Sequence, residues 1–462
     1  MSGAPATDLP VAVVGGGLAG ISAALHLADR GVPVILFEAR SHLGGATYSF
    51  QRGELSVDTG QHVFLRCYQS YRQLLERLGT SHLAPIQERF AIPVLHRPRP
   101  DGPLRTAWLR RGTWAPAPLH LASGLARYSP LTVRERALAA TAAAALRTVD
   151  PDDSSADRVA FGPWLRRRRQ SERAIERLWA LISVAALNVP PDQASLALAA
   201  RVFRTGLLEQ ADAADLGIPA TSLRQLHADP ASRLLDRLGV RLHTSTKVQR
   251  IAVDGARFVL RTRRDECLAR AVVVAVPHQA ASQLVPTEAA PDRHRWADLG
   301  SSPIVNVHLH YDRRVTNLPF AAALDSPVQW VFDRTLAAGA RRGQYLVVSL
   351  SAASDQVDKP TEVLVRAFTA ALADLFPQAR AARLLDAFVT REPHATFRQR
   401  PGTASLRPLP LTQVPGLVLA GAWTRTGWPD TMEGAVRSGL RAADLLDRYD
   451  RAPHDALTEA LP

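Results

Sequence analysis

The sequence predicts an α/β fold in which a Rossmann-like βαβ domain is interrupted by an inserted, mixed α+β domain. Two observations lead to this prediction. A short apolar run at residues 11–14 is followed by glycines, a helical pattern and a second apolar run at 34–37. A third apolar run, at 417–420, appears near the end of the chain. A chain of 462 residues is also too long for one compact core and suits two or three domains.

The first segment of the chain has the clearest local pattern. Residues 11–14 are uninterrupted apolar side chains, which is typical of a strand buried in a parallel sheet. Between residues 18 and 29 apolar side chains recur at helical spacing, and Gly31 ends this helix. Residues 34–37 then form a second buried strand. This order of strand, helix and strand predicts a βαβ unit.

The later segments differ in pattern, and the differences place the domain boundaries. Residues 83–130 predict β-structure with long loops, 131–228 predict mainly helices, and the alternation at 305–311 predicts a half-buried strand. Further strands are expected at 240–244, 248–253, 258–262, 271–276 and 417–420, and further helices at 362–376 and 434–449. We therefore expect a nucleotide-binding domain made of residues 8–80, 235–300 and 405–450, and a substrate-binding domain made of 81–234 and 301–404.

Charge and cysteine content limit the classes of function. The net charge is +13, and among the 56 Lys and Arg residues only Lys247 and Lys359 are lysine. Such a positive charge indicates binding to nucleic acid or to an anionic membrane surface, or it reflects a compositional bias toward arginine. No nucleic-acid-binding module accompanies it, so we expect no nucleic-acid partner. Cys67 and Cys267 are far apart, which argues against a disulfide scaffold or a metal site and favours a reducing cytoplasm.

No segment has the pattern of a signal peptide or of a membrane-spanning helix. The longest uncharged apolar run, at about 137–146, has half of the roughly 20 residues that a spanning helix needs. We therefore expect a cytoplasmic protein that is soluble or lies on the inner face of the cell membrane. The four arginines at 166–169 predict a solvated helix face, and contact with anionic lipid is the alternative.

A Gly-x-Gly-x-x-Gly pattern follows the first predicted strand and opens the predicted helix. In such a loop the glycines permit a tight turn and close approach of the backbone to a pyrophosphate, and the helix start supplies N–H donors. Glu38 ends the second strand, 38 − 20 = 18 residues after the last glycine, where an acid binds ribose hydroxyls. These features predict a dinucleotide site whose backbone contacts come from Gly15, Gly17, Leu18, Ala19 and Gly20.

A second glycine pair, shortly after Glu38, indicates which dinucleotide binds. The segment 40–47 resembles, with one extra residue, the Arg-x-x-Gly-Gly element of the amine oxidase and phytoene desaturase flavoprotein superfamily, and 417–439 resembles its C-terminal flavin element. The resemblance implies FAD, bound in an extended pose by a Rossmann-like domain of the amine oxidase (glutathione-reductase-like) type. It adds the following residues to the predicted FAD site: Ala39, Arg40, Gly44, Gly45, Ala46, Thr47, Val248, Gly421, Ala422, Thr431, Met432 and Ala435.

Ala422 departs from the pattern of this superfamily. An acid usually stands at this position and bonds the ribityl or phosphate region of FAD, which alanine cannot do. We therefore expect either weaker FAD binding, or a water or another side chain in place of the acid. The resemblance also implies that the backbone N–H of Met432 faces the flavin pyrimidine and that the backbone of Val248 contacts the adenine.

Within the superfamily the chain resembles the hydroxysqualene dehydroxylases, also called squalene-associated FAD-dependent desaturases. Their Asp-x-Gly-Gln-His-x-Phe run is matched at 58–64, and further matches occur at 185–191, 329–334 and 423–434. This resemblance implies a polyisoprenoid lipid substrate, hydroxysqualene, whose hydroxyl group is removed reductively to give squalene for hopanoid or related synthesis. It also implies an electron donor that reduces the FAD.

The segment 58–62 carries the candidate reacting groups. In the superfamily this strand runs beside the isoalloxazine, which implies flavin contacts from Gly60, Gln61 and His62. Either His62 or Asp58 is the candidate proton donor, and ordinary strand polar groups are the alternative. The candidate substrate contacts are Asn188, Trp330, Phe332 and Trp423. The alternative for Asn188 is that it caps a turn, and the alternative for Trp330 and Phe332 is that they pack in the core.

Two other functions stay open on the sequence. A carotenoid- or phytoene-type desaturase, or an amine-oxidase-like flavoenzyme, would run the flavin in the oxidising direction. A non-catalytic lipid-binding relative would keep the fold without the flavin, and the intact glycine pattern with Glu38 argues against it. No hydrolase or ATPase motif is present.

Overall fold

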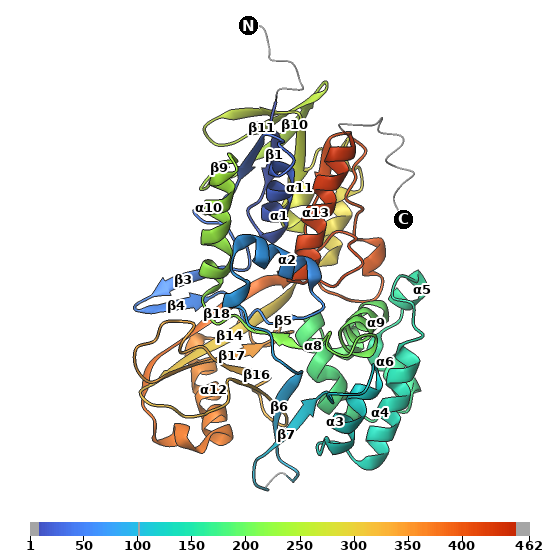
Figure 1. Cartoon of the computed structure of the whole chain (residues 1–462), viewed down its shortest axis with the longest axis vertical. Helices are drawn as coiled ribbons and strands as arrows, with labels where there is room; N and C mark the ends of the chain where they lie inside the picture. Colours follow the sequence, from blue (N-terminus) through green and yellow to red (C-terminus); the bar gives the residue numbers. More distant parts are fainter. Residues whose placement is uncertain (1–8, 100–101, 450–462) are drawn as a thin grey trace.

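The structure is a computed structural model that describes residues 9–99 and 102–449; the predicted domain limits at residues 8 and 450 lie outside this range. The molecule is elongated, with one lobe built on a parallel sheet and the other on a larger mixed sheet (Figure 1). None of the helices in these ranges is both long enough and apolar enough to cross a bilayer.

The first lobe is organised around a five-stranded parallel sheet. The central strand β1 lies between β13 and β2 and is buried along its whole length. The strands follow the order β19 (Leu417–Leu419), β13 (Ala271–Val274), β1 (Val11–Val14), β2 (Val34–Phe37) and β9 (Arg241–His243). Strands that are distant in the sequence therefore pair directly, and the sheet is completed only by the C-terminal part of the chain.

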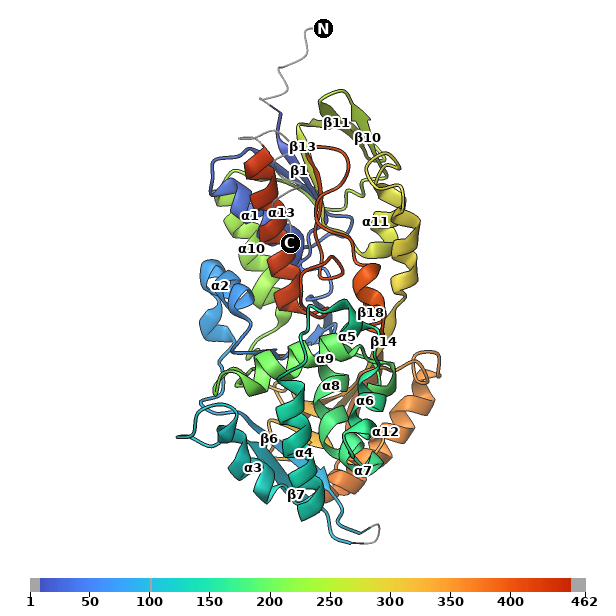
Figure 2. The same cartoon turned by 90° about the vertical axis from the view of Figure 1, so that its right-hand side faces the viewer.

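Helices cover one face of the parallel sheet, and a small antiparallel sheet covers the other (Figure 2). The helices of the first face are α1 (Leu18–Ala28), α2 (Gln69–Leu78), α10 (Asp229–Arg237) and α13 (Met432–Tyr449). The opposite face carries β10 (Arg250–Asp254), β11 (Arg257–Arg261) and β12 (Glu266–Ala269), with α11 (His278–Leu284) and η8 (Arg293–Leu299). The predicted strands of this region are present, and β12 is an additional one.

The second lobe is built on a seven-stranded mixed sheet. All its neighbouring strands pair antiparallel except β15 and β6, which are parallel. The order is β18 (Leu384–Thr396), β14 (Ser302–Tyr311), β17 (Gln344–Leu350), β16 (Trp330–Asp333), β15 (Phe320–Ala323), β6 (Ala91–His96) and β7 (Arg105–Arg110). The helix α12 (Thr361–Leu375), predicted at 362–376, packs on one face of this sheet.

A group of helices packs on the other face, mainly against β6, β15 and β16. Residues 131–228 are mainly helical, as predicted, although a short strand β8 (Leu216–Gly217) pairs there with β5 (Phe64–Leu65). The helices are α3 (Ala122–Arg127), α4 (Val133–Leu146), α5 (Ser154–Asp157), α6 (Phe161–Arg167), α7 (Glu172–Ala174), α8 (Ala180–Leu187) and α9 (Leu196–Phe203). Shorter helical turns are η2 (Ser81–Leu83), η3 (Leu119–Leu121), η4 (Ile175–Trp179), η5 (Pro191–Gln193), η6 (Arg204–Leu208), η7 (Arg224–Ala228), η9 (Pro377–Ala381) and η10 (Thr403–Ser405).

The expectation that 305–311 is a half-buried strand is wrong, because β14 is buried on both faces. Its apolar side chains face α12, and the ribbon of β3 (Ser49–Arg52) and β4 (Leu55–Asp58) packs over this part of the sheet on the other side. His308, on that second side, is bonded by the Tyr345 hydroxyl at 2.7 Å and the Thr390 hydroxyl at 3.0 Å. This histidine is therefore satisfied by neighbouring side chains rather than by solvent.

Candidate functional site

The first glycine loop joins β1 to α1 in a conformation that larger residues could not adopt. Gly15 has φ +110°, and a Cβ on Gly20 would lie 1.9 Å from the Gly15 carbonyl oxygen. Gly17 is the N-cap of α1, and no side chain caps this helix. The N–H groups at the start of α1 are thus available to an anion, as a pyrophosphate site requires.

Glu38 lies beside this loop at the end of β2. Its carboxylate accepts hydrogen bonds from the backbone N–H groups of Gly16 and Arg40, both at 2.7 Å, and its side chain is buried. Ala39 and Arg40 are exposed just beyond it. The neighbouring loop, which contains Val248, is held here because the N–H of Thr246 bonds the Glu38 carbonyl at 2.8 Å.

The second glycine loop rests directly on the first. The N–H of Gly44 donates to the Gly16 carbonyl at 2.8 Å, and a Cβ on Gly45 would lie 2.9 Å from the Gly17 Cα. Thr47 is buried and donates its hydroxyl to the Gly44 carbonyl, and the Ala46 carbonyl accepts from the Thr59 hydroxyl at 2.7 Å. The two loops form one backbone cradle that side chains would fill, which fits a bound dinucleotide.

The C-terminal element closes the same cradle. A Cβ on Gly439 would lie 2.1 Å from the Ala19 carbonyl oxygen, so α13 packs closely against the start of α1. Met432 is the first residue of α13, which places its amide at the N-terminal end of that helix. Thr431 and Ala435 lie beside it, because the Ala435 N–H donates to the Thr431 carbonyl at 2.9 Å. The predicted FAD-binding residues at the two ends of the chain thus meet in space, as a site for an extended FAD requires.

Arg407, whose position the sequence pattern did not indicate, holds the loop in which Ala422 replaces the usual acid. Its buried guanidinium donates to the carbonyls of Ala422 at 2.9 Å and Thr424 at 2.6 Å and lies over the Phe397 ring. Burial lowers the pKa of Arg407 to about 10. The loop that begins at Gly421 is therefore positioned through its backbone carbonyls rather than through a side chain at position 422.

Glu433 is a second residue with a function that the sequence did not reveal. Its fully buried carboxylate accepts from the backbone N–H groups of Ser70 and Tyr71, at the start of α2, and pairs with Arg437 at 2.7 Å. An acid at a helix N-terminus satisfies N–H groups that have no partner within the helix. Glu433 thus fixes the segment that follows His62 to the N-terminal end of α13.

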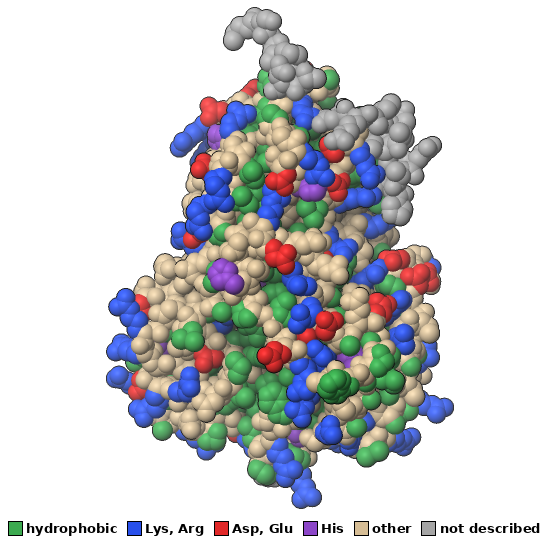
Figure 3. Space-filling model, viewed as in Figure 1, with side chains coloured by type: hydrophobic (Ala, Val, Ile, Leu, Met, Phe, Trp, Pro, Cys, Tyr) green, Lys and Arg blue, Asp and Glu red, His purple; other side chains and the backbone are tan. Residues whose placement is uncertain are grey.

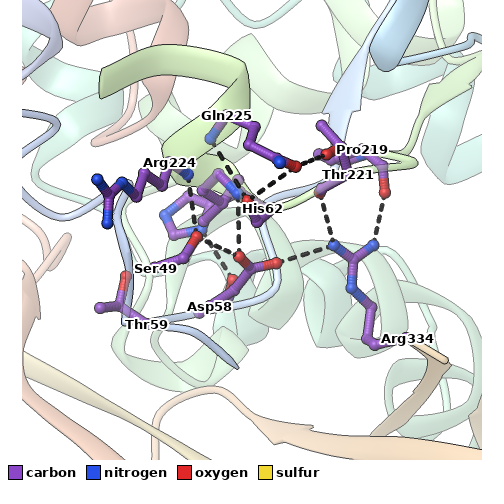
Figure 4. A network of polar contacts seen from close by, with 12 residues as sticks. Ser49, Asp58, Thr59, His62, Pro219, Thr221, Arg224, Gln225 and Arg334 are labelled. Atoms are coloured by element: carbon purple, nitrogen blue, oxygen red, sulfur yellow. Dashed lines mark hydrogen bonds and ion pairs between the residues drawn. The ribbon is translucent and has the colours of Figure 1, made fainter. Parts of the chain in front are cut away.

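A buried ion pair joins the two lobes at the segment 58–62 (Figure 4). Asp58 accepts from the Arg334 guanidinium at 2.8 Å, the Ser49 hydroxyl at 2.7 Å and the Leu223 N–H at 3.0 Å. Arg334 also donates to the Pro219 carbonyl at 2.6 Å. Asp58, predicted as an alternative proton donor, therefore acts in this structure as an acceptor that anchors Arg334.

His62 is the half-buried imidazole beside this ion pair. Its Nδ1 lies 3.0 Å from the Gly60 carbonyl oxygen, which can only accept, so Nδ1 carries hydrogen and Nε2 is the acceptor in the neutral ring. Burial lowers the pKa of His62 below its ordinary value, and the Gly60 carbonyl opposes part of that effect. His62 is therefore mainly neutral at pH 7, and its acid form would present an N–H at Nε2.

A small hollow lies at this point, with one polar and one apolar side. Asp58, Gln61, His62 and Arg334 form the polar side. Phe332 on the apolar side belongs to the large core beneath the helices of the second lobe, and Trp330 stacks on it at 6.3 Å between ring centroids. The apolar wall consists of Val63, Ile218, Pro219, Leu223 and Phe332.

Two of the predicted substrate contacts lie elsewhere. Asn188 ends α8 with φ +55°; its amide nitrogen donates to the Ser302 carbonyl at 2.9 Å and its amide oxygen accepts from the Ala352 N–H at 2.6 Å. Trp423 is buried in the core beside the parallel sheet, where its ring is tilted against that of Trp296, and its indole N–H donates to the Val276 carbonyl at 2.9 Å. Both side chains have their polar atoms occupied by protein, which is the pattern of structural residues.

Comparison with known proteins agrees with this geometry. The family model for flavin-containing amine oxidoreductases matches residues 18–446. A hydroxysqualene dehydroxylase from Sinorhizobium fredii is 29% identical over 94% of this chain and 97% of its own length. A zeta-carotene desaturase from Zea mays is 25% identical over 95% of this chain and 83% of its own length.

Solved structures share the fold. Putrescine oxidase bound to putrescine has a TM-score of 0.71 at 17% identity, covering 95% of this chain and 99% of that one. Cyclohexylamine oxidase from Brevibacterium oxydans has a TM-score of 0.69 at 19% identity, covering 96% and 100%. With the double glycine cradle, Glu38 and the C-terminal element in place, this protein is an FAD-dependent oxidoreductase that belongs to the flavin-containing amine oxidoreductase family.

Proposed function

We propose that the enzyme removes the hydroxyl group of hydroxysqualene reductively and releases squalene. The observation that carries this proposal is the two-sided hollow, in which polar groups able to contact a hydroxyl face an apolar wall continuous with a large core. Relatives named hydroxysqualene dehydroxylase, similar along nearly the whole chain, support the choice of substrate. The hollow has room for about one water molecule, so in this structure it fits the hydroxyl group and not the carbon chain.

The reaction must move a hydride and a proton in balance. The C–O bond breaks, a C–H bond forms with the incoming hydride, and the leaving oxygen takes a proton and departs as water. The hydride would come from bound FAD, reduced beforehand by an external electron donor. Because hydroxide is a poor leaving group, the protein must protonate the oxygen as the bond breaks.

His62 is the residue that we assign to this proton transfer. Its acid form keeps one N–H on the Gly60 carbonyl and can give the other, at Nε2, to the leaving oxygen. Asp58 and Arg334 face the same hollow and position the chain around it, since their charges are satisfied by each other. The apolar wall excludes water from the reacting end of the substrate.

An anaerobic assay tests the proposal directly. Enzyme with chemically reduced FAD is mixed with hydroxysqualene, and we expect squalene to form with stoichiometric reoxidation of the flavin, measured by gas chromatography and by flavin absorbance. The control is the same mixture with oxidised enzyme. Reduced enzyme that keeps its flavin reduced and yields no squalene would refute the assignment. Formation of a more unsaturated product from oxidised enzyme would favour the alternative that the carotene desaturase relatives represent.

The proton transfer predicts a pH dependence. Since the donor is the protonated form of His62 and its pKa lies below 6.5, kcat/KM for squalene formation should fall tenfold per pH unit above that pKa. His62→Asn should lower kcat/KM by about 100-fold and remove this inflection. His82→Asn, at an exposed histidine in η2, is the matched control and should keep the wild-type profile. An unchanged inflection in His62→Asn would assign the proton to another group.

A further inference from the structure

A second surface of the molecule combines exposed apolar side chains with unpaired arginines. Large apolar side chains project from residues 108–133: Trp108 is 41% exposed, Trp114 96%, Leu119 64% and Val133 76%. Single exposed apolar residues are ordinary, but a group of them, including a nearly free tryptophan, marks an interaction site. We name these four residues, with Arg105, Arg110, Arg127 and Arg134, the Trp114 surface.

These residues lie together in the fold. The loop that carries Trp114 is closed at its base by the Gly112 N–H bonding the His120 carbonyl. Gly124 in α3 packs on the backbone of Arg110, where a Cβ would lie 1.9 Å from the carbonyl oxygen. β7, the loop and α3 are therefore adjacent, at the end of the molecule remote from the parallel sheet (Figures 1 and 2). Figure 3 shows hydrophobic and basic side chains gathered over this lower part of the face.

The charge of the Trp114 surface is of one sign. Residues 102–134 contain arginines but no Asp or Glu. All four of its arginines are exposed, and no ion pair or hydrogen bond connects their side chains to any residue in the part of the chain that the structure describes. Arg166, in the arginine run at 166–169, differs because Glu172 and Asp192 neutralise it at 2.6 Å each. The four arginines of the Trp114 surface therefore keep a positive charge that no acidic side chain among the described residues neutralises.

A buried ion triad fixes this surface to the site. Asp215, whose side chain is fully buried, accepts from Arg111 at 2.8 Å and from Arg66 at 3.2 Å. Arg111 directly precedes the Trp114 loop, and Arg66 directly follows the β5 strand that comes after His62. The exposed apolar loop is therefore held in a defined position relative to the segment that carries the reacting groups.

We propose that the Trp114 surface docks the enzyme onto an anionic lipid bilayer. Its apolar side chains enter the boundary between headgroups and acyl chains, where tryptophan is favoured, and its arginines contact lipid phosphates. The unpaired arginines complement the negative charge of the lipid headgroups, and the apolar side chains between them complement the acyl chains. An uncharged partner would leave the arginines without a counter-charge. This binding is a property of the surface and goes beyond the proposed reaction, so it can be tested without substrate.

Vesicle co-sedimentation of the FAD-loaded enzyme tests the proposal. We expect binding to phosphatidylcholine vesicles that contain 30% phosphatidylglycerol, and little binding to pure phosphatidylcholine. Trp114→Ser with Leu119→Ser should weaken partitioning by about tenfold or more, because the inserted apolar area is lost. Arg110→Ser should weaken it about fivefold, and raised salt should reproduce that loss.

Leu336→Ser is the matched control, since Leu336 is 91% exposed but lies outside the Trp114 surface. This variant should bind vesicles like the wild type, and all variants should keep their flavin absorbance. Equal binding by the wild type and by the Trp114→Ser, Leu119→Ser variant would overturn the proposal, as would equal weakening by Leu336→Ser. Wild-type enzyme that binds neither kind of vesicle would also overturn it and would leave a protein partner as the occupant.

Discussion

Replacing Arg334 with methionine is expected to lower the free energy of unfolding by about 3–5 kcal/mol. The substitution leaves the Asp58 carboxylate buried, with no cation to replace the guanidinium that lies 2.8 Å away. It also leaves the carbonyls of Pro219 and Thr221 without their donor. The loss should appear as a lower midpoint in urea denaturation followed by circular dichroism.

Two further variants make this measurement specific. Adding Asp58→Asn to Arg334→Met removes both charges and should recover part of the lost stability, because the uncompensated carboxylate is gone. Arg257→Met removes an arginine that pairs with Asp254 in the open and should cost at most about 1 kcal/mol. If Arg334→Met were no more harmful than Arg257→Met, the ion pair would not be what joins the two lobes.

Gly20→Ala is expected to reduce the flavin content of the purified protein at least tenfold. The new Cβ on α1 would stand 1.9 Å from the Gly15 carbonyl oxygen, and because that oxygen belongs to the backbone, the loop or the start of α1 must move. The amides at the start of α1 would then no longer converge on one pyrophosphate. The ratio of flavin absorbance to protein absorbance measures this effect, with circular dichroism to show that the protein is folded.

Gly31→Ala, at the other end of α1, is the matched control for this prediction. Gly31 also has a positive φ, +74°, but nothing lies within 4 Å of the added Cβ. The alanine should cost about 1–2 kcal/mol of stability through backbone strain alone and leave the flavin content unchanged. If the Gly20→Ala protein were purified with the same flavin content as the wild type, close contact between Gly15 and Gly20 would not be required for FAD binding.

Local patterns in the sequence were enough to predict the nucleotide side of the molecule. The spacing of Gly15, Gly17 and Gly20 and the position of Glu38 are set by contacts within one βαβ unit, so they are readable over a short stretch. Helices and strands with a regular hydrophobic period could also be predicted from a short stretch. β14 shows the limit of this approach, because an alternating pattern does not reveal whether the second face of a strand is exposed to solvent or covered by another part of the chain.

Contacts between distant segments could not be predicted in this way. Arg334 and Asp58 are 276 positions apart, and in an arginine-rich chain nothing marks Arg334 or Arg407 as the buried ones. Whether Trp423 meets substrate or core depends on which side of the sheet its loop crosses, and the structure buries it near Trp296. Asn188 is likewise determined by Ser302 in β14 and by Ala352 just after β17, both of which are distant from it in the sequence.

The central position of β1 in the parallel sheet affects how the protein is made on the ribosome. One edge of β1 can pair with β2 soon after both strands are synthesised. The other edge pairs with β13, which begins 271 − 14 = 257 residues after β1 ends. At about 5–20 residues per second, translation leaves that apolar edge unpaired for roughly 13–51 s. An unpaired strand edge is a template for aggregation, so nascent chains should depend on chaperones during this interval. Because β19 and α13 emerge still later, the predicted FAD site can form only after α13 has been synthesised.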